Sequence, residues 1–321
     1  MLLFAGLVGL RVYLSRAYVA AVLAGDAPYV AGRSRLSFDF SKLTIPRGEI
    51  HSGGPPKDGI PALNKPVFVA AAEARFLKPD DRVIGVELGG KAKAYPLRIL
   101  TWHEIVNDQL AGVPLAVTFC PLCDSVEAFD RRTPGGVKLF GVSGLLYNSN
   151  VLMFERGKTP EILCSQIKAE VVSGRRSGER LKTLPVELTT WQAWRTRHPR
   201  TQVLSTNTGH SRDYAVDPYR GYLDRPDLIF GVRPMSRRLA VKAKVLGVWT
   251  GRTARAYPLA DLAQSQAPLK QQIDERRFTL QYDPRAKSVR VTHADAGVEW
   301  MYSLWFAWYA FHPKTEVFSA R

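Results

Sequence analysis

The stretch Val83-Ile-Gly-Val-Glu-Leu-Gly-Gly-Lys-Ala-Lys-Ala-Tyr-Pro-Leu97 indicates how this chain folds. Two short runs of strand-forming residues flank Gly89-Gly90, a dipeptide typical of tight turns, so the stretch predicts a β-hairpin. A related stretch returns as Val245-Leu-Gly-Val-Trp-Thr-Gly-Arg-Thr-Ala-Arg-Ala-Tyr-Pro-Leu259. The chain therefore uses the same hairpin twice.

A second pattern is also repeated, in the same order. Trp191-x-x-Trp194-x-x-x-His198-Pro199 returns as Trp305-x-x-Trp308-x-x-x-His312-Pro313. The second pair of markers is closer together by about 48 residues, which indicates two related units, the second shortened. We predict an α+β protein, β-rich with short hairpins, whose units are closed by the Trp-x-x-Trp helices. We expect an apolar helix or anchor over 1–36, a main domain over 37–210 and the shortened unit over 211–321, packed on the first.

The repeat separates architectural residues from functional ones. Features present in both units, such as His198 and His312, are expected to be structural, and each histidine stands at a helix end before a proline. Features found only in the first unit are candidates for function. We expect the second unit to lack the segments Cys120-Pro-Leu-Cys123 and Gly141-Val-Ser-Gly144.

Cys120 and Cys123 are the leading candidates. The apolar run 115–119 predicts a buried strand that delivers both thiols to a turn at Pro121. Two sulfurs at this spacing can bind one metal ion, close a disulfide, or act as the attacking and resolving thiols of a redox site. All three alternatives remain open from the sequence.

His103 and Glu104 are expected near the thiols, because 105–110 and 113–119 read as a hairpin with its turn at Ala111-Gly112. We predict a metal site of Cys120, Cys123 and His103, which suits copper or zinc. Glu104 would be an acid/base group or a fourth ligand. The alternative is that His103 is a buried histidine that donates to a backbone carbonyl.

Two further segments supply candidate ligand-binding groups. Tyr147, Asn148 and Ser149 follow a glycine-rich strand and could hydrogen-bond a bound group, or could form a tight turn packed in the core. Ser165 and Gln166 are predicted to hydrogen-bond around the thiol site. Their neighbour Cys164 is expected to be a small buried side chain.

Two loop regions are expected near this site. The stretch 52–61, rich in proline and glycine, is either a surface linker or a wall over the thiols. The polar and aromatic stretch 207–222 includes His210 and Asp213, which are weaker candidates for the site.

The amino-acid composition limits the classes of partner that this chain is expected to bind. The formal net charge is +16, but the basic residues are scattered, without a basic run or an aromatic platform, so we expect no nucleic-acid binding. The charge favours possible contact with a membrane surface. We expect the remaining partner to be an unidentified small molecule or a metal ion. Three cysteines in 321 residues do not make a disulfide scaffold.

The first residues favour an exported, periplasmic or membrane-anchored protein. Met1 to Leu10 is apolar, Arg11 and Arg16 interrupt it, and a second apolar run follows over 18–23. Neither run reaches the length of about 20 residues that spans a bilayer. An interrupted anchor, a truncated signal and an ordinary amphipathic helix all fit.

Several of these motifs together resemble the domain-of-unknown-function family numbered 3179. They are the segments 52–61, 94–100, 102–108, 120–123, 140–149 and Ser165-Gln166. The resemblance runs from about residue 37 to the end of the chain and implies an export signal or a membrane anchor, but no known activity. In the family an aromatic residue precedes the Ser-Gln pair, whereas this chain has Cys164.

Three hypotheses follow. The first is a metal-binding protein or metalloenzyme using Cys120, Cys123 and His103. The second is a thiol-disulfide oxidoreductase with Cys120 as nucleophile and Cys123 as resolving thiol. The third is a structural or binding module without catalytic activity, in which the cysteines pair or pack.

Overall fold

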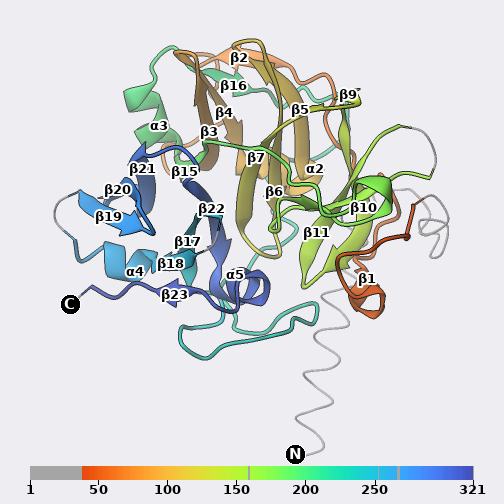
Figure 1. Cartoon of the computed structure of the whole chain (residues 1–321). Helices are drawn as coiled ribbons and strands as arrows, with labels where there is room; N and C mark the ends of the chain where they lie inside the picture. Colours follow the sequence, from red (N-terminus) through yellow and green to blue (C-terminus); the bar gives the residue numbers. More distant parts are fainter. Residues whose placement is uncertain (1–37, 158–159, 252, 266–267, 321) are drawn as a thin grey trace, which may run out of the picture.

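The computed structural model describes residues 38–157, 160–251, 253–265 and 268–320. Short strands dominate it and the helices are few and short, so the prediction of a β-rich α+β protein is confirmed. The strands form three large sheets, a smaller three-stranded sheet and one two-stranded ribbon (Figure 1). The expected apolar helix or anchor over 1–36 lies outside the described residues.

The first unit is built on the hairpin expected from the sequence. Strands β3 (Arg82–Leu88) and β4 (Lys91–Pro96) pair through the Gly89-Gly90 turn. The sheet order is β15-β3-β4-β16-β2, with β15 (Glu187–Thr190), β16 (Gln202–Leu204) and β2 (Phe68–Ala70). Helix α2 (Leu97–His103) follows β4, with Pro96 at its N-cap, and α3 (Trp191–Arg197) connects β15 to β16. Pro96 lacks the N–H that the start of a helix leaves unpaired, which explains its place there.

The second unit repeats this arrangement. The order β22-β17-β18-β23 matches β15-β3-β4-β16, including the parallel pairing of the last strand. Its elements are β17 (Lys244–Trp249), β18 (Ala254–Pro258), α4 (Leu259–Leu262), β22 (Glu299–Leu304), α5 (Trp305–Phe311) and β23 (Glu316–Val317).

One packing contact explains why the two sequence patterns are repeated together. The ring of Trp194 covers Gly85, where a Cβ atom would lie 2.2 Å from the ring. Trp308 covers Gly247 with the same 2.2 Å spacing. In both units the indole also donates to a threonine, from Trp194 to Thr201 and from Trp308 to Thr315, each at 3.0 Å. The strand glycine and the helix tryptophan are thus one structural device used twice.

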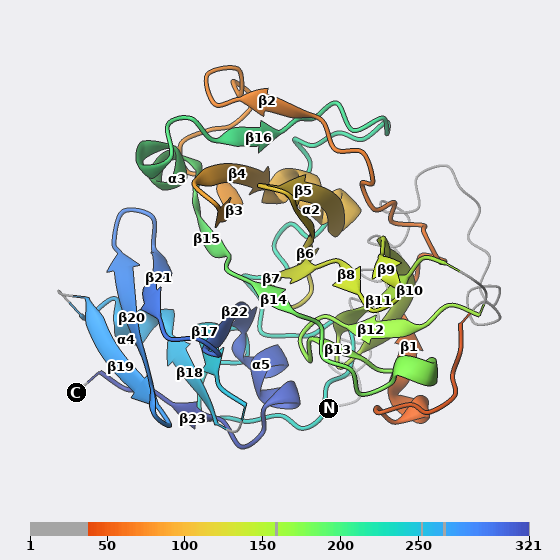
Figure 2. The same cartoon turned by 45° about the horizontal axis from the view of Figure 1, so that its top comes forward.

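Each unit also carries a three-stranded meander. In the first these are β5 (Ile105–Leu110), β6 (Val113–Cys120) and β7 (Ser125–Asp130). In the second they are β19 (Leu269–Ile273), β20 (Arg276–Asp283) and β21 (Ser288–Ala294). The meanders cross between the units: β7 pairs with β22 through Val126 and Tyr302, and β21 is bonded to β15 through Ser288 and Thr189 at 3.0 Å. Strands of both units therefore share one sheet (Figure 2).

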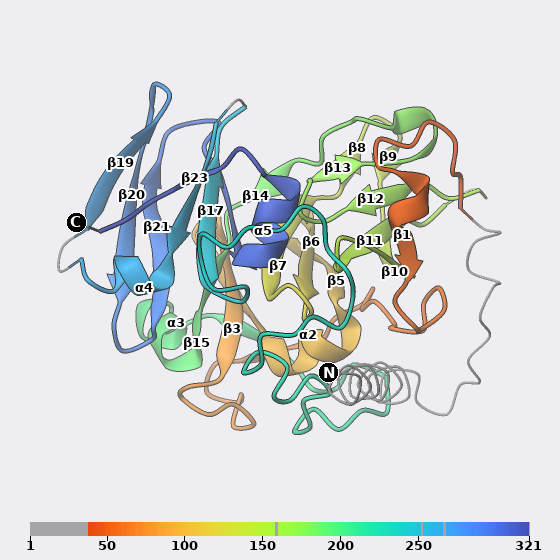
Figure 3. The same cartoon turned by 90° about the horizontal axis from the view of Figure 1, so that it is seen from below.

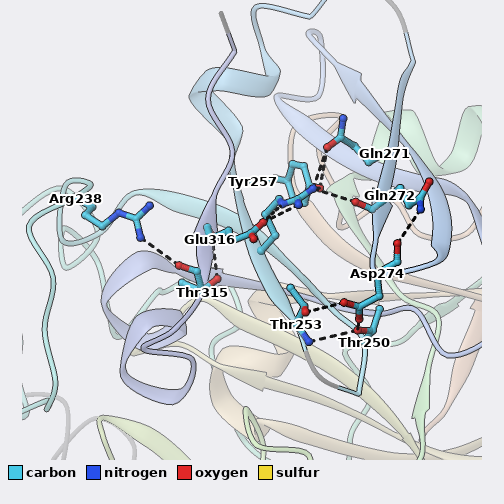
Figure 4. Close-up of polar contacts among 10 residues, drawn as sticks. Arg238, Thr250, Thr253, Tyr257, Gln271, Gln272, Asp274, Thr315 and Glu316 are labelled. Carbon is cyan, nitrogen blue, oxygen red and sulfur yellow. Dashed lines mark hydrogen bonds and ion pairs between the residues drawn. The ribbon is translucent and has the colours of Figure 1, made fainter.

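A polar cluster between hairpin and meander shows how closely the units correspond. In the first unit, Asp108 accepts from Tyr95 at 2.8 Å and from Lys93 at 2.7 Å. In the second, Tyr257 donates to Gln271 at 3.1 Å (Figure 4), and Arg255 donates to the same side chain at 3.4 Å. An amide in place of the carboxylate accepts the same hydrogen bonds without the charge.

The remaining large sheet belongs to the first unit and follows its meander. Its order is β1-β10-β11-β12-β13, and it lies at the opposite side of the molecule from β19 (Figure 1). Its strands are β1 (Ile50–Ser52), β10 (Phe140–Tyr147), β11 (Asn150–Glu155), β12 (Leu163–Ser165) and β13 (Glu170–Val171). The smaller elements are η2 (Arg47–Glu49), β8 (Arg132–Thr133), β9 (Gly136–Val137), η3 (Gly174–Arg176) and β14 (Thr183–Leu184), which pairs with β7.

Residues 205–243 form a cover segment, which connects β16 to β17 and contains no helix or strand. Figure 3 shows this segment, in teal, running over the part of the molecule between α2 and α5. Several of its apolar side chains are buried in the main core, among them Tyr214, Tyr219, Tyr222 and Ile229. Many of its other residues are exposed, and a loop of this length whose aromatic side chains anchor it in the core is typical of a functional loop. No helix within the described residues is long and apolar enough to cross a membrane.

Candidate functional site

The two site cysteines lie in the turn between β6 and β7. Cys120 ends β6 and pairs with Ser125, the first residue of β7, while Asp124 takes a left-handed conformation with φ of 47°. The second unit has the same turn between β20 and β21, where Lys287 has φ of 48°. The expectation that the second unit lacks this segment is therefore corrected: its backbone turn is retained, but Asp283-Pro-Arg-Ala286 stands where the first unit has Cys120-Pro-Leu-Cys123.

Both thiols are buried and unlinked, and both face one backbone oxygen. Cys123 Sγ lies 3.3 Å from the carbonyl oxygen of Ser149, and Cys120 Sγ lies 3.8 Å from it. Asn148 and Ser149 form the two-residue turn between β10 and β11, and both have positive φ, at 51° and 61°. This combination is characteristic of the type I′ hairpin turn. The turn thus places a backbone carbonyl against the thiol pair.

The two thiols differ in acidity. Burial acts to raise the pKa of Cys120, but hydrogen bonds from the Cys123 thiol and from backbone amides, including those of Val151 and Leu122, lower it below its ordinary value. Burial raises the pKa of Cys123 well above the ordinary value, and its hydrogen bond to Cys120 raises it further. The arrangement favours a thiolate on Cys120 and a protonated thiol on Cys123.

Glu104 is the titratable group next to this pair. Burial raises the pKa of its carboxyl well above the ordinary value, and the charge of Cys120 raises it further. Glu104 follows α2 in a left-handed conformation with φ of 55°, and its carbonyl oxygen accepts from the amide of Phe119 at 2.8 Å. A protonated carboxyl beside a thiolate can supply a proton, and the carboxylate that remains can accept one.

The structure does not bring His103 into the same group. The predicted pairing of β5 with β6 is present, but the ring of His103 is engaged elsewhere. Its Nδ1 lies 2.7 Å from the carbonyl oxygen of Pro61, and its Nε2 lies 2.7 Å from the hydroxyl of Tyr214. Burial lowers the pKa of His103 to about 4. This matches the alternative of a buried histidine bonded to a backbone carbonyl.

Within the described ranges, no cluster of three or more His, Cys, Asp or Glu side chains is placed to hold a metal ion. The predicted three-ligand set of Cys120, Cys123 and His103 is therefore not assembled. The physical reason is that both ring nitrogens of His103 already have partners.

A buried hydrogen-bond network supports the cysteine turn from behind. Gln166 accepts from Ser125 at 2.6 Å and from Asn150 at 2.8 Å, and donates to Thr118 at 2.9 Å. Asn150 also donates a hydrogen bond to Cys123, which lowers the pKa of that thiol. Gln166 thus lies where the sequence placed it, next to the turn. Asn150 was not among the predicted site residues, although it ends the same polar run as Tyr147.

The other predicted residues lie around the network rather than in it. The hydroxyl of Ser165 is bonded to the amide of Lys168 at 3.4 Å. The side chain of Asn148 accepts from the amide of Arg233 at 2.9 Å. Tyr147 is half-buried and packs edge-on against Phe311. Cys164 is buried between its strand neighbours.

The cover segment closes the site from the other side. The hydroxyl of Tyr222 donates to the carbonyl oxygen of Leu122 at 3.1 Å, inside the cysteine turn. The hydroxyl of Ser149 donates to the carbonyl oxygen of Phe230 at 2.9 Å. Lys242 holds the segment together, with its Nζ 3.4 Å from the centre of the Tyr222 ring and 2.7 Å from the Asp227 carbonyl oxygen. The sequence analysis had singled out Ser149 and the stretch 207–222, which contains Tyr222, whereas Phe230 and Lys242 had no distinctive signal in the sequence.

The two loop expectations have different outcomes. His210 lies against the ring of His103, with centroids 5.2 Å apart, and Asp213 is exposed, so neither enters the thiol group. The proline-rich stretch 52–61 lies along β10, where Gly53 and Asp58 donate to Gly144 and Val142. The cover segment, not this stretch, closes over the thiols.

The site thus combines an acidic thiol, a neighbouring protonated thiol and a buried carboxyl, all excluded from water. Such a set is suited to thiol chemistry, because one sulfur can attack and the other can resolve.

A comparison with known protein families identifies the family of this chain. A family model described as a protein of unknown function, DUF3179, matches residues 57–299. No curated protein and no solved structure matches the chain.

Proposed function

The chain belongs to the DUF3179 family of unknown function, and we propose that it carries out thiol-disulfide exchange, with Cys120 as the attacking thiol and Cys123 as the resolving thiol. The observation that carries this proposal is that two buried, unlinked thiols of one turn lie against the same carbonyl oxygen, that of Ser149, at 3.8 Å for Cys120 and 3.3 Å for Cys123. The lowered pKa of Cys120 and the raised pKa of Cys123 support the assignment of the two roles. A nucleophilic sulfur with a protonated partner beside it is what disulfide exchange requires.

The first step consumes a substrate disulfide. The Cys120 thiolate attacks one substrate sulfur, so that a bond from Cys120 to substrate forms and the substrate disulfide bond breaks. The leaving thiolate takes a proton from the carboxyl of Glu104, which its raised pKa keeps protonated.

The second step releases the substrate. The Glu104 carboxylate takes the proton of Cys123, and the resulting thiolate attacks Cys120 Sγ. The bond from Cys120 to the substrate breaks, and the second substrate sulfur leaves and takes a proton from water. The substrate gains two electrons, and the chain is oxidised to a Cys120–Cys123 disulfide.

Because both sulfurs are buried, substrate can reach Cys120 only when the cover segment moves. The segment is held at the turn by the hydrogen bond from Tyr222 to Leu122 and at the neighbouring hairpin by the bond from Ser149 to Phe230. A segment held over the site by so few hydrogen bonds can open locally, without global unfolding of the chain.

The test uses the small disulfide 5,5′-dithiobis(2-nitrobenzoate) on the reduced, native chain. Wild type should release two equivalents of thionitrobenzoate rapidly and keep no adduct, because Cys123 resolves the mixed disulfide. Cys123→Ser should release one equivalent and keep an adduct that mass spectrometry maps to Cys120. Cys164→Ala, the matched control, should behave as wild type. An adduct retained by wild type, or one mapped to Cys164, contradicts the proposal.

Metal binding is a second proposal, favoured by the convergence of both sulfurs on one carbonyl oxygen. Two thiolates without a third side-chain ligand suit Cu(I) better than Zn²⁺, because Zn²⁺ sites are usually tetrahedral. Elemental analysis of protein purified under reducing conditions tests it. About one equivalent of copper, lost in Cys120→Ser and retained in Cys164→Ala, would support it, and a copper content unaffected by Cys120→Ser would overturn it.

A further inference from the structure

A cavity of about 380 Å³ lies between the two repeat units, next to the cysteine turn, whose Asp124 is part of its lining. Corresponding parts of both units line it. Arg82, which begins β3, faces it together with its second-unit counterpart Lys244, which begins β17. Thr189 of β15 and Ser303 of β22 form a second such pair. The cavity is thus a product of the duplication.

Cationic side chains gather around this cavity. Arg82, Lys244, Arg285 and Lys287 all line it, against the carboxylates of Asp80 and Asp124. Arg82 and Asp124 neutralise each other through two hydrogen bonds of 2.8 Å each. Among the ion pairs of the described residues, none engages Lys244, Arg285 or Lys287. Asp80 in the lining, and Asp224, whose charge acts on Lys244, therefore stand against three cations.

This clustering of like charges is unfavourable without a counter-charge. The positive charge of Arg82, followed by burial, lowers the pKa of Lys244; the carboxylates of Asp124 and Asp224 partly offset this, and the charge of Lys287 lowers the pKa further. Cations held together around a concave site create a field that attracts an anion. A bound anion would balance the remaining positive excess.

We propose that this cavity binds the phosphate group of a small molecule, held by Lys244, Arg285 and Lys287. Lysine and arginine are the usual side chains for this group. The Arg82–Asp124 pair forms a fixed wall, and hydroxyl groups such as that of Thr190 offer neutral hydrogen bonds.

The size of the cavity fits a small ligand. About 380 Å³ is within the range of small-molecule sites. A second cavity of about 600 Å³ shares Asp80, Thr190, Arg285 and Ala286 with it, so the two adjoin along the β20–β21 turn. The rest of a phosphorylated molecule can extend from the cationic cavity into the larger one.

This site does not depend on thiol chemistry. The β20–β21 turn at this cavity corresponds to the cysteine turn of the first unit. The cover segment and the β10–β11 hairpin close over the cysteine turn. The β20–β21 turn has neither covering element, which leaves Arg285 and Lys287 exposed.

The test is calorimetric titration of the full chain with inorganic phosphate at constant ionic strength in sodium chloride. Lys244→Gln combined with Lys287→Gln should lower the affinity at least tenfold relative to wild type. Lys270→Gln combined with Lys314→Gln is the matched control, because it removes the same charge from exposed sites outside the cavity, and it should bind as wild type. Thermal melts establish that each variant is folded.

If the control loses as much affinity as the cavity variant, attraction is only to the overall positive charge, and the proposal is overturned. It is also overturned if wild type binds phosphate no better than chloride. If the double variant does not fold, Lys287→Gln alone replaces it, because Lys287 lies at an exposed turn position. Its affinity for phosphate is then compared with that of wild type and of the control variant. Glycerol phosphate in place of inorganic phosphate distinguishes a phosphate ester from the free ion: tighter binding of the ester indicates that the adjoining cavity is used.

Discussion

Cys123 Sγ lies 3.3 Å from the carbonyl oxygen of Ser149, and this contact joins the two parts of the first unit that make the site. Cys123 belongs to a turn that both repeat units share, whereas Ser149 belongs to a hairpin that the second unit lacks. The thiol pair is therefore enclosed by an element added to the repeated framework. The candidate site therefore depends on an element that the first unit has and the second unit lacks.

Removing Cys123 should make Cys120 less acidic. In Cys123→Ala the Cys120 thiolate loses the hydrogen bond that the neighbouring thiol donates, so its pKa should rise. The thiolate absorbance near ~240 nm, followed against pH, measures this, and Cys164→Ala is the control that should leave the transition in place. An unchanged or lower pKa of Cys120 in Cys123→Ala would show that the thiol contact does not stabilise the thiolate.

Glu104 should make the fold less stable as the pH rises. The pKa of the Glu104 carboxyl is raised in the folded chain above the ordinary 4.5. The contribution of this group to the free energy of unfolding is therefore full below pH 4.5 and is lost as the pH rises toward the pKa of Glu104 in the folded chain. Glu104→Gln keeps an uncharged side chain of the same shape and removes this loss. Between pH 4.5 and the raised pKa of Glu104, the free energy of unfolding of the variant relative to wild type should increase by about 1.4 kcal/mol per pH unit.

Chemical denaturation at a series of pH values measures the free energies of unfolding. Glu275→Gln, at the exposed β19–β20 turn, is the control and should show no such gain. Equal dependence on pH in wild type and Glu104→Gln would mean that the carboxyl is ionised without penalty, and its role as a proton donor would fail.

Loosening the cover segment should expose Cys120. Tyr222→Phe removes the hydrogen bond to the Leu122 carbonyl, which contributes about 0.5–1.5 kcal/mol. The rate at which iodoacetamide alkylates Cys120 should rise about twofold to twelvefold, since ~1.4 kcal/mol corresponds to a factor of ten. Tyr309→Phe, outside the segment on α5, should not change the rate. A rate unaffected by Tyr222→Phe would indicate that access does not depend on this contact.

The two glycine–tryptophan contacts should respond alike to substitution. A Cβ atom at Gly85 or Gly247 would lie 2.2 Å from the covering tryptophan ring, so Gly85→Ala and Gly247→Ala should each lower the free energy of unfolding by about 1–3 kcal/mol or more. Gly231→Ala has no heavy atom within 4 Å of its Cβ and is the control. Thermal and urea denaturation measure the three variants. A tolerated substitution in one unit only would show that the two contacts are not equivalent.

Local patterns predicted much of the fold. The Gly89-Gly90 hairpin, the Ala111-Gly112 hairpin and the Trp-x-x-Trp helices all depend on neighbours in the sequence, and all are present. The crossing of the meanders could not be predicted, because the pairing of Val126 with Tyr302 joins residues far apart in the chain. No alternation of apolar residues specifies which sheet an edge strand joins.

The site was predicted in part for the same reason. Cys120, Cys123 and Glu104 lie together because short hairpins fix them, and adjacent chain positions were enough to suggest it. His103 was expected to contact the thiols because it precedes Glu104. The left-handed conformation at Glu104, with φ of 55°, follows the helix end, and the His103 ring bonds to Pro61 and Tyr214 instead. Tyr222 reaches the turn through a loop without periodic structure, which no sequence pattern places.

The most direct measurement of the central claim is a redox titration of the native chain. The protein is equilibrated in glutathione buffers of graded potential, free thiols are alkylated, and mass spectrometry maps the linked cysteines. The account predicts one reversible two-electron transition that links Cys120 to Cys123 and leaves Cys164 as a free thiol. Thiols at Cys120 and Cys123 that stay reduced at every potential, or a disulfide that includes Cys164, would contradict it.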